Sequence, residues 1–243
     1  MLEVERLVVR QVDERRPPPV DGISLDVRRG EVLGLFGLLG AGCTEALLAI
    51  FGAWPGRCDG VIRINGEVRR VGSPGAAIRA GLGLVAQDRR LALMHDRSIA
   101  DNIVLASLPA FTWRGFVDRA AMLRRAGELT EALEIKAPSV ETEVGTLSGG
   151  NQQKVQIARW LATKSRVLLL VDPTRGVDVG ARAVINRLWR RLAADGHAIL
   201  LFSSEAEELA ELCDRVLILV RGRIEAECSG DFQELDLLGA AAA

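Results

Sequence analysis

The fold is decided between residues 31 and 51, where the sequence reads EVLGLFGLLGAGCTEALLAIF. The apolar run 31–36 is typical of a buried strand, and 44–51 has the composition of a helix. The glycine-rich segment between them predicts a tight loop from the end of a strand to the start of a helix. In such a unit the backbone can wrap closely around an anion.

Apolar runs and amphipathic stretches alternate along the rest of the chain. Further strands are expected at 2–10, 23–27, 61–64, 68–71, 82–86, 167–171, 198–202, 216–220 and 223–226. Asn65-Gly66 marks a tight hairpin between two of them. Helices are expected at 152–162, 179–194 and 205–212. The alternation predicts an α/β fold with a largely parallel sheet and an N-terminal antiparallel part.

The segment 98–143 differs from its surroundings, because its pattern is helical and contains no expected strand. We interpret it as a helical subdomain inserted into an α/β core formed by about 1–97 and 144–228. Trp113, Trp160 and Trp189 are expected to be packing residues on helices. No internal repeat is visible, so 1–243 is read as a single domain.

Composition narrows the classes of function. The formal net charge of −1 argues against binding nucleic acid through the whole surface. No apolar run is long enough to cross a bilayer and the first residues do not resemble a secretory signal, so we expect a cytoplasmic chain that meets membranes through a partner. Four scattered cysteines and two histidines predict no zinc site.

The glycine-rich loop has the context of a phosphate-binding loop. Its residues are Gly37, Leu38, Leu39, Gly40, Ala41, Gly42, Cys43 and Thr44. Backbone N–H groups and the helix N-terminus would hold phosphates, and the Thr44 hydroxyl stands where it could ligate Mg²⁺. The standard motif has lysine at Cys43, and losing that ammonium costs roughly 3 kcal/mol in the transition state. Taken alone, the loop could equally be a glycine-rich turn that binds nothing.

A second motif lies at Leu147, Ser148, Gly149, Gly150, Asn151 and Gln152, followed by Gln153 and Lys154. A serine N-cap explains Ser148 but not the whole string. LSGGNQQK resembles the signature of the ABC ATPases, in particular the ribose-, galactose- and arabinose-type sugar importers with two cassettes in tandem. PTRGVDVG at 173–180 matches the same subgroup. The resemblance extends from about residue 2 to residue 226.

This resemblance implies a P-loop NTPase fold of the ABC cassette type, with ATP and Mg²⁺ as ligands. It implies three partners: a second cassette, transmembrane permease subunits and, indirectly, a periplasmic sugar-binding protein. The signature would contact ATP bound on the partner cassette. Gln87 matches the loop glutamine that senses Mg²⁺ and transmits movement to the permease, and Asp178 matches an aspartate at the dimer contact.

Three departures resemble the second, degenerate cassette of such importers. Cys43 replaces lysine, and Ser204 stands where active cassettes have the switch histidine. Val171-Asp172 stands where they have Asp-Glu, so Asp172 would be a shortened catalytic base. If the alignment slips by one residue, Asp172 is the magnesium residue and the base is absent. Either reading predicts that this chain's own site hydrolyses ATP slowly or not at all, while its signature completes the partner's site.

Two other functions remain as alternatives. One is a scaffold or regulatory module that binds nucleotide without hydrolysis. The other is a soluble ABC protein of DNA repair or translation, which the absence of a coiled-coil insertion and of a basic composition disfavours. An aromatic residue to stack on adenine is not evident near 9–20, and the chain contains no tyrosine.

Overall fold

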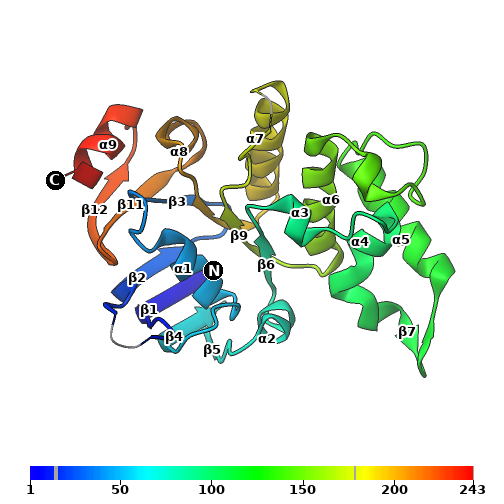
Figure 1. Ribbon diagram of the computed structural model, residues 1–243, viewed down its shortest axis with the longest axis horizontal. Helices are drawn as coiled ribbons and strands as arrows, with labels where there is room; N and C mark the ends of the chain where they lie inside the picture. Colours follow the sequence, from blue (N-terminus) through cyan, green and yellow to red (C-terminus); the bar gives the residue numbers. More distant parts are fainter. Residues whose placement is uncertain (14–15, 178, 243) are drawn as a thin grey trace. The chain divides into compact units, whose positions relative to one another are not determined.

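The computed structural model describes residues 1–13, 16–177 and 179–242 (Figure 1). The chain forms two compact units. The first, here called the core unit, comprises Met1–Leu84, Arg166–Asp172 and Asn186–Ala243, and the second, the helical unit, comprises Val85–Ser165 and Pro173–Ile185. By these contacts the helical unit contains 85–97, 144–165 and 173–185 in addition to the segment 98–143 that the sequence pattern separates from the core.

A mixed six-stranded sheet has the order β12-β11-β3-β10-β9-β6. Its strands are β3 (Val32–Phe36), β6 (Leu82–Val85), β9 (Val167–Val171), β10 (Ala198–Phe202), β11 (Arg215–Val220) and β12 (Arg223–Ser229). β11, β3, β10 and β9 run parallel to one another, and β12 is antiparallel to β11. β3 and β9 are buried along their whole length, as continuous apolar runs predict. The predicted α/β class is confirmed.

The second sheet of the core unit is antiparallel, with the order β2-β1-β4-β5. Its strands are β1 (Leu2–Val9), β2 (Val20–Val27), β4 (Cys58–Ile64) and β5 (Glu67–Arg69). Asn65 and Gly66 join β4 to β5, both with positive φ, as a two-residue hairpin turn requires. The expected hairpin is therefore confirmed.

Helices α1 (Cys43–Ile50), α2 (Pro74–Arg79), α8 (Ala206–Leu212) and α9 (Glu234–Ala242) belong to the core unit, together with the second half of α7 (Val179–Ala194). Figure 1 shows α9 beside β12, in a tail for which the sequence predicted no element. Leu237 anchors α9 because its side chain is completely buried.

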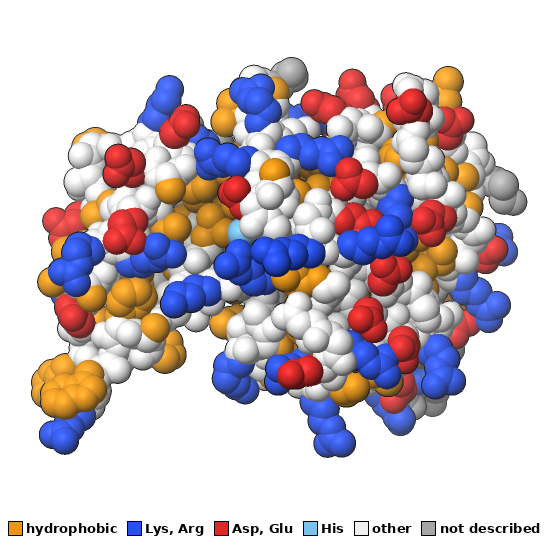
Figure 2. All heavy atoms as spheres, turned by 180° about the vertical axis from the view of Figure 1, so that it is seen from behind, with side chains coloured by type: hydrophobic (Ala, Val, Ile, Leu, Met, Phe, Trp, Pro, Cys, Tyr) orange, Lys and Arg blue, Asp and Glu red, His pale blue; other side chains and the backbone are white. Residues whose placement is uncertain are grey.

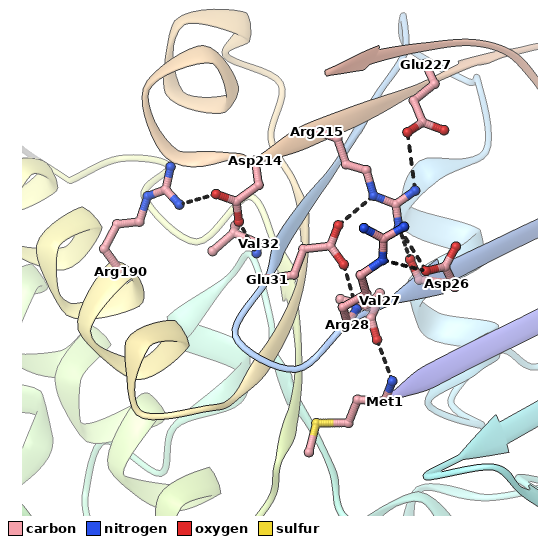
Figure 3. Close-up of polar contacts among 10 residues, drawn as sticks. All are labelled: Met1, Asp26, Val27, Arg28, Glu31, Val32, Arg190, Asp214, Arg215 and Glu227. Atoms are coloured by element: carbon pink, nitrogen blue, oxygen red, sulfur yellow. Dashed lines mark hydrogen bonds and ion pairs between the residues drawn. The ribbon is translucent and has the colours of Figure 1, made fainter. Parts of the chain in front are cut away.

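An ionic cluster around Arg215 joins the two sheets of the core unit (Figure 3). At the start of β11, Arg215 donates to Glu31 beside β3, to Asp26 on β2 and to Glu227 on β12. Burial lowers the pKa of Arg215, but the hydrogen bonds and charges of these carboxylates outweigh it and raise the pKa above its usual value. The nearby Asp214 accepts from the Val32 N–H at 2.8 Å, which fixes the start of β3.

The helical unit contains α3 (Arg89–Ala92), α4 (Ile99–Val104), the 3-10 helices η1 (Leu105–Phe111) and η2 (Val144–Thr146), α5 (Arg119–Ala132), α6 (Gly149–Ala162) and the first half of α7. Two of these helices start with a side-chain N-cap. Ser98 accepts from the Asp101 N–H, and Asp118 accepts from the Ala121 N–H. Within the described residues, no helix is both long and apolar enough to cross a bilayer.

Two expectations for this unit are wrong. The short strands β7 (Thr112–Trp113) and β8 (Phe116–Val117) interrupt the segment predicted to be helical throughout. Trp113 lies on this hairpin with 71% of its surface exposed, whereas Trp160 and Trp189 are buried on helices as expected. The physical reason is the turn: Arg114 and Gly115 both have positive φ, which reverses the chain and ends helical structure.

Candidate functional site

The glycine-rich loop connects β3 to α1 in the core unit, and backbone contacts hold its shape. A Cβ at Gly42 would lie 2.0 Å from the Pro19 carbonyl oxygen, and one at Gly37 would lie 2.6 Å from the Leu219 carbonyl oxygen. Glycine is therefore required at both positions. The Gly222 N–H, in the turn between β11 and β12, donates to the Ala41 carbonyl at 3.0 Å.

The loop leaves the N-terminus of α1 open. Gly42 is the N-cap residue in a left-handed conformation, and no described side chain caps the helix. The first N–H groups of a helix have no partner inside it and carry partial positive charge. Thr44 lies half-buried in the first turn, while Leu38 and Leu39 are exposed. These features fit a phosphate group held by backbone donors.

Cys43 supplies neither charge nor an exposed side chain. It is 3% exposed, and burial raises the pKa of its thiol to about 12, with further contributions from the negative charges of Glu45 and Asp172. The sulfur points back into the loop, 3.3 Å from where a Cβ on Gly37 would lie. The thiol is therefore neutral at physiological pH, and 37–44 contains no cationic side chain.

The structure brings Asp172 and Ser204 together. β9 ends at the buried Val171, which pairs with Phe202 on β10, so the residues after the two parallel strands meet at the same edge. Asp172 is 4% exposed, has a φ of 44° and accepts from the Ser204 N–H at 2.6 Å. The exposed Ser204 lies directly beside this carboxylate through its backbone.

Two neighbours of Ser204 were missed by sequence reasoning. The buried Ser203 hydroxyl donates to Glu208 on α8 at 2.6 Å and accepts from the Glu205 N–H at 3.1 Å. Glu208 is completely buried. These bonds hold the turn that carries Ser204. No signal in the sequence distinguishes Glu208 from the exposed glutamates around it.

The signature motif lies in the helical unit at the start of α6. Ser148 is the N-cap residue by position, yet its hydroxyl does not cap the helix and instead accepts from the Asn151 side chain at 3.0 Å. Asn151 in turn accepts from the Lys136 N–H at 3.0 Å. The N–H groups of Gly149 and Gly150 thus begin a helix whose end has no side-chain cap within the described part of the chain.

Gln152 has a different environment from the residues before it. Its side chain is buried and donates to the Leu147 carbonyl at 3.1 Å and the Val144 carbonyl at 3.3 Å. The amide nitrogen therefore stabilises the turn that leads into α6. Gly150 also packs closely, since a Cβ there would lie 3.1 Å from the Ala181 Cβ on α7.

Gln87 follows β6 and lines a polar pocket of about 470 Å³ in the helical unit. The other lining residues are Asp88, Arg90, Arg175 and Gly176. The structure thus brings the Gln87 loop beside the PTRG segment, although the two are far apart in the sequence. Asp178 lies outside the described residues. Among the residues that the structure describes, no cluster of three or more His, Cys, Asp and Glu could hold a metal ion.

Arg159 connects the signature helix to the segment after Gln87, and the sequence analysis missed it. This α6 side chain is 7% exposed and donates to the Ala92 carbonyl at 2.7 Å, the Asn102 carbonyl at 2.8 Å and the Asn102 side-chain oxygen at 3.0 Å. Burial lowers its pKa to about 10, so it remains charged at neutral pH. Asn102 also bonds both backbone groups of Met94. An arginine inside the apolar run 157–162 was the available signal.

A backbone cradle between a buried parallel strand and an uncapped helix defines the class of P-loop nucleotide-binding proteins. Within this class, the profile described as ABC transporter matches residues 20–175. The chain belongs to the ABC transporter family.

The curated relatives include import ATP-binding proteins for two sugars. The chain is 46% identical over 228 residues to the ribose import ATP-binding protein RbsA of Chelativorans sp. (strain BNC1), covering 93% of this chain and 45% of the relative. It is 43% identical over 233 residues to the xylose import ATP-binding protein XylG of Burkholderia cenocepacia (strain HI2424), covering 96% and 44%. The chain thus spans about half the length of the curated relatives it matches.

Solved structures show the same fold at low sequence identity. A nucleotide-free ATP-binding cassette from an ABC transporter has a TM-score of 0.81 at 20% identity, covering 98% of this chain and 95% of that one. A dimeric cassette in a post-hydrolysis state, bound to ADP and phosphate, has a TM-score of 0.77 at 22% identity, covering 94% and 98%. The fold of an ABC cassette is therefore established for this chain.

Proposed function

We propose that this chain is the ATP-binding component of an ABC importer for monosaccharides, and that it completes a partner's catalytic site while its own is impaired. The names of the relatives, which are import proteins for ribose and for xylose, support the substrate class. Their length, about twice that of this chain, supports a working unit with a second cassette, either fused or separate.

The remaining partners follow from the same proposal. Transmembrane permease subunits would hold the chain at the cytoplasmic face of the membrane, and a periplasmic sugar-binding protein would deliver the sugar to them. ATP and Mg²⁺ are the proposed ligands. Gln87 would sense the ion and transmit movement to the permease, and Asp178 would contact the second cassette.

The chain's own site would bind phosphates mainly through its backbone. N–H groups of the loop and of the α1 N-terminus would hold them, and the Thr44 hydroxyl would ligate Mg²⁺. Cys43 adds no charge because its thiol is neutral and buried. The Asp172 carboxylate is held by the Ser204 N–H and is shorter than the glutamate of active cassettes, which weakens it as a base. We therefore propose binding with little or no hydrolysis.

The observation that carries the proposal is the open N-terminus of α6. Asn151 donates to the Ser148 hydroxyl and Gln152 donates to the Leu147 carbonyl, while no described side chain caps the N–H groups that begin the helix. Such a helix end would bind the γ-phosphate on the second cassette and stabilise its transition state electrostatically.

The test combines this chain with a hydrolysis-competent cassette of a ribose importer and measures steady-state ATP hydrolysis. We expect negligible hydrolysis by the chain alone and a rate for the mixture well above the sum of the parts. Hydrolysis by the chain alone at the rate of an active cassette would contradict the impaired site. Nucleotide binding without stimulation of the partner would instead favour a scaffold or regulatory module.

A further inference from the structure

The hairpin formed by β7 and β8 exposes a small apolar tip, here called the hairpin tip (Trp113–Val117). Trp113 is 71% exposed, Phe116 79% and Val117 48%. Figure 2 shows it as a hydrophobic projection at the lower left, with a cationic group at its end. Exposing several large apolar side chains to water at one place is unfavourable, so such a group of side chains indicates a binding surface.

The hairpin tip is an ordered structure. Trp113 pairs with Phe116 across the two strands, which places both rings on one face. The Arg114 guanidinium carbon lies 4.7 Å from the centre of the Trp113 ring. At the base, the Asp118 N–H donates to the Phe111 carbonyl at 2.8 Å. Apolar rings and a cation are thus presented together before any ligand binds.

The segment that carries the hairpin tip has only positive charge, although the whole chain is nearly neutral. Residues 105–117 read LASLPAFTWRGFV, with Arg114 as the single charged residue and no acidic one. Tryptophan, phenylalanine and arginine are the side chains that favour the boundary between lipid headgroups and acyl chains. An arginine beside them adds attraction to anionic lipid phosphates.

We propose that the hairpin tip inserts into the headgroup layer of an anionic bilayer, with Arg114 on a lipid phosphate and Trp113 and Phe116 at the acyl boundary. A stable protein interface needs roughly 20 to 30 residues on each side. A bilayer, in contrast, accepts a narrow projection of a few side chains. One such contact gives only weak, reversible binding, so it would orient the chain at a membrane and not anchor it.

The test uses the 243-residue chain with vesicles of phosphatidylglycerol and phosphatidylethanolamine at millimolar lipid, measured by co-sedimentation and tryptophan fluorescence. We expect binding, a blue shift, and quenching by brominated acyl chains. Trp113→Phe should keep the binding and lose most of the shift. Trp113→Ser with Phe116→Ser should weaken binding by at least about tenfold, because the double variant lacks the two rings that the bilayer would bury. Arg114→Gln should weaken it about fivefold.

Matched variants elsewhere test whether the effect is local. Leu235→Ser and Val68→Ser remove exposed apolar side chains from α9 and β5, and Arg70→Gln removes an exposed cation. These variants should bind like the unchanged chain, and every variant should retain its circular dichroism spectrum. Phosphatidylcholine vesicles and added salt should both weaken binding, because the lipid charge is absent or screened.

Three results would overturn the proposal. The first is no binding to anionic vesicles at millimolar lipid. The second is binding that the Trp113 and Phe116 substitutions leave unchanged, which would place the contact on another surface. The third is protection of Trp113 only in vesicles that contain a transmembrane partner, which would make the occupant a protein groove. None of these results depends on whether the chain hydrolyses ATP.

Discussion

The starts of α1 and α6 present the same backbone groups in opposite surroundings. Before α1, Gly42 adopts a left-handed conformation against Pro19, and the adjacent side chain is the neutral Cys43 thiol. Before α6, Ser148 is extended and its hydroxyl is held by Asn151. The first helix start keeps its backbone geometry without the usual charge, whereas the second keeps both its backbone and its polar side chains.

This difference shows what each site depends on. The α1 loop is fixed by glycines that no other residue could replace, so its shape survives the loss of a functional side chain. The α6 start is fixed by hydrogen bonds that the Asn151 and Gln152 side chains donate, to the Ser148 hydroxyl and to the Leu147 carbonyl. Its geometry would change if those side chains changed. The presence of Asn151 and Gln152, which hold the start of α6, is therefore the stronger argument for a function at α6.

The largest effect is expected from Ser148→Arg, which fills the open end of α6 with a bulky side chain. Stimulation of a competent partner cassette should fall by at least about a hundredfold, the usual cost of losing an oriented donor in a transition state. Nucleotide binding to the chain itself should stay within about twofold. The two measurements are steady-state ATP hydrolysis of the mixture and equilibrium binding of a fluorescent ATP analogue.

The control for this variant is Gly127→Arg on α5, where an added Cβ meets open space. Gly127→Arg should leave stimulation unchanged. If the Ser148→Arg variant stimulates the partner's ATP hydrolysis as well as the unchanged chain does, α6 does not contact the partner's nucleotide. The difference between the two helix starts would then have no functional role.

A second prediction concerns the buried network behind α6. Arg159→Met removes three hydrogen bonds, to the Ala92 and Asn102 carbonyls and to the Asn102 side-chain oxygen, the last of which keeps the Met94 N–H as a donor. The free energy of unfolding should fall by about 2 to 3 kcal/mol. Hydrogen exchange should increase in α3, α4 and α6 more than in α1.

Arg124→Met is the matched control, since Arg124 is an exposed arginine on α5 of the same unit. It should change the free energy of unfolding by less than about 0.5 kcal/mol. Arg159→Lys keeps the charge and should recover only part of the stability, because an ammonium cannot reach acceptors in three directions in the same plane. An equal increase of hydrogen exchange in α1 and α6 would show that Arg159 stabilises the whole chain and not the signature helix in particular.

Much of the fold follows from local sequence. β9 and β10 were predicted to the residue because continuous apolar runs bounded by polar residues allow little else. The hairpin tip was missed because helical periodicity on both sides concealed a turn at Arg114 and Gly115. The helix α9 was missed because its alanine-rich tail gives little periodicity, and contact with the sheet stabilises it.

The candidate site could be predicted only where a motif has fixed spacing. The loop 37–44 and the signature 147–152 are contiguous, so their residues could be named from the sequence. Asn102 and Arg159 act through a contact between segments 57 residues apart, and a sequence pattern does not show that contact. Glu208 bonds Ser203 only five residues before it, but a buried charge looks like an exposed one in a sequence. The roles of Asp172 and Ser204 remain predictions, although β9 and β10 place them side by side.

A third prediction restores the missing charge of the α1 loop. Cys43→Lys should raise affinity for ATP about tenfold, since a single charge-assisted contact is worth on the order of 1.5 kcal/mol. The rate of hydrolysis by the isolated chain should stay low, because Asp172 and Ser204 are unchanged. The exposed Cys58→Lys adds the same charge elsewhere and should leave affinity unchanged. A large rise in the hydrolysis rate with Cys43→Lys would show that lysine alone was missing.

The smallest effect tests whether Asp172 faces the loop. The thiol of Cys43 has its pKa raised to about 12, first by burial and also by the charges of Glu45 and Asp172. Asp172→Asn keeps an oxygen for the Ser204 N–H and removes the negative charge, so the Cys43 pKa should fall and more thiolate should form at a given pH. Alkylation of Cys43 at pH 9 should accelerate about two- to threefold, followed by mass spectrometry.

Cys213 is the internal control for this measurement. Its thiol pKa is also raised, mainly by burial, and the charges that act on it are those of Arg190, Asp214 and Glu208. Its alkylation rate should therefore be the same in both proteins. Acceleration at both cysteines would indicate that the substitution loosens the core unit. Acceleration at Cys43 alone requires the carboxylate and the loop to be close in solution, as they must be if Asp172 occupies the base position of this site.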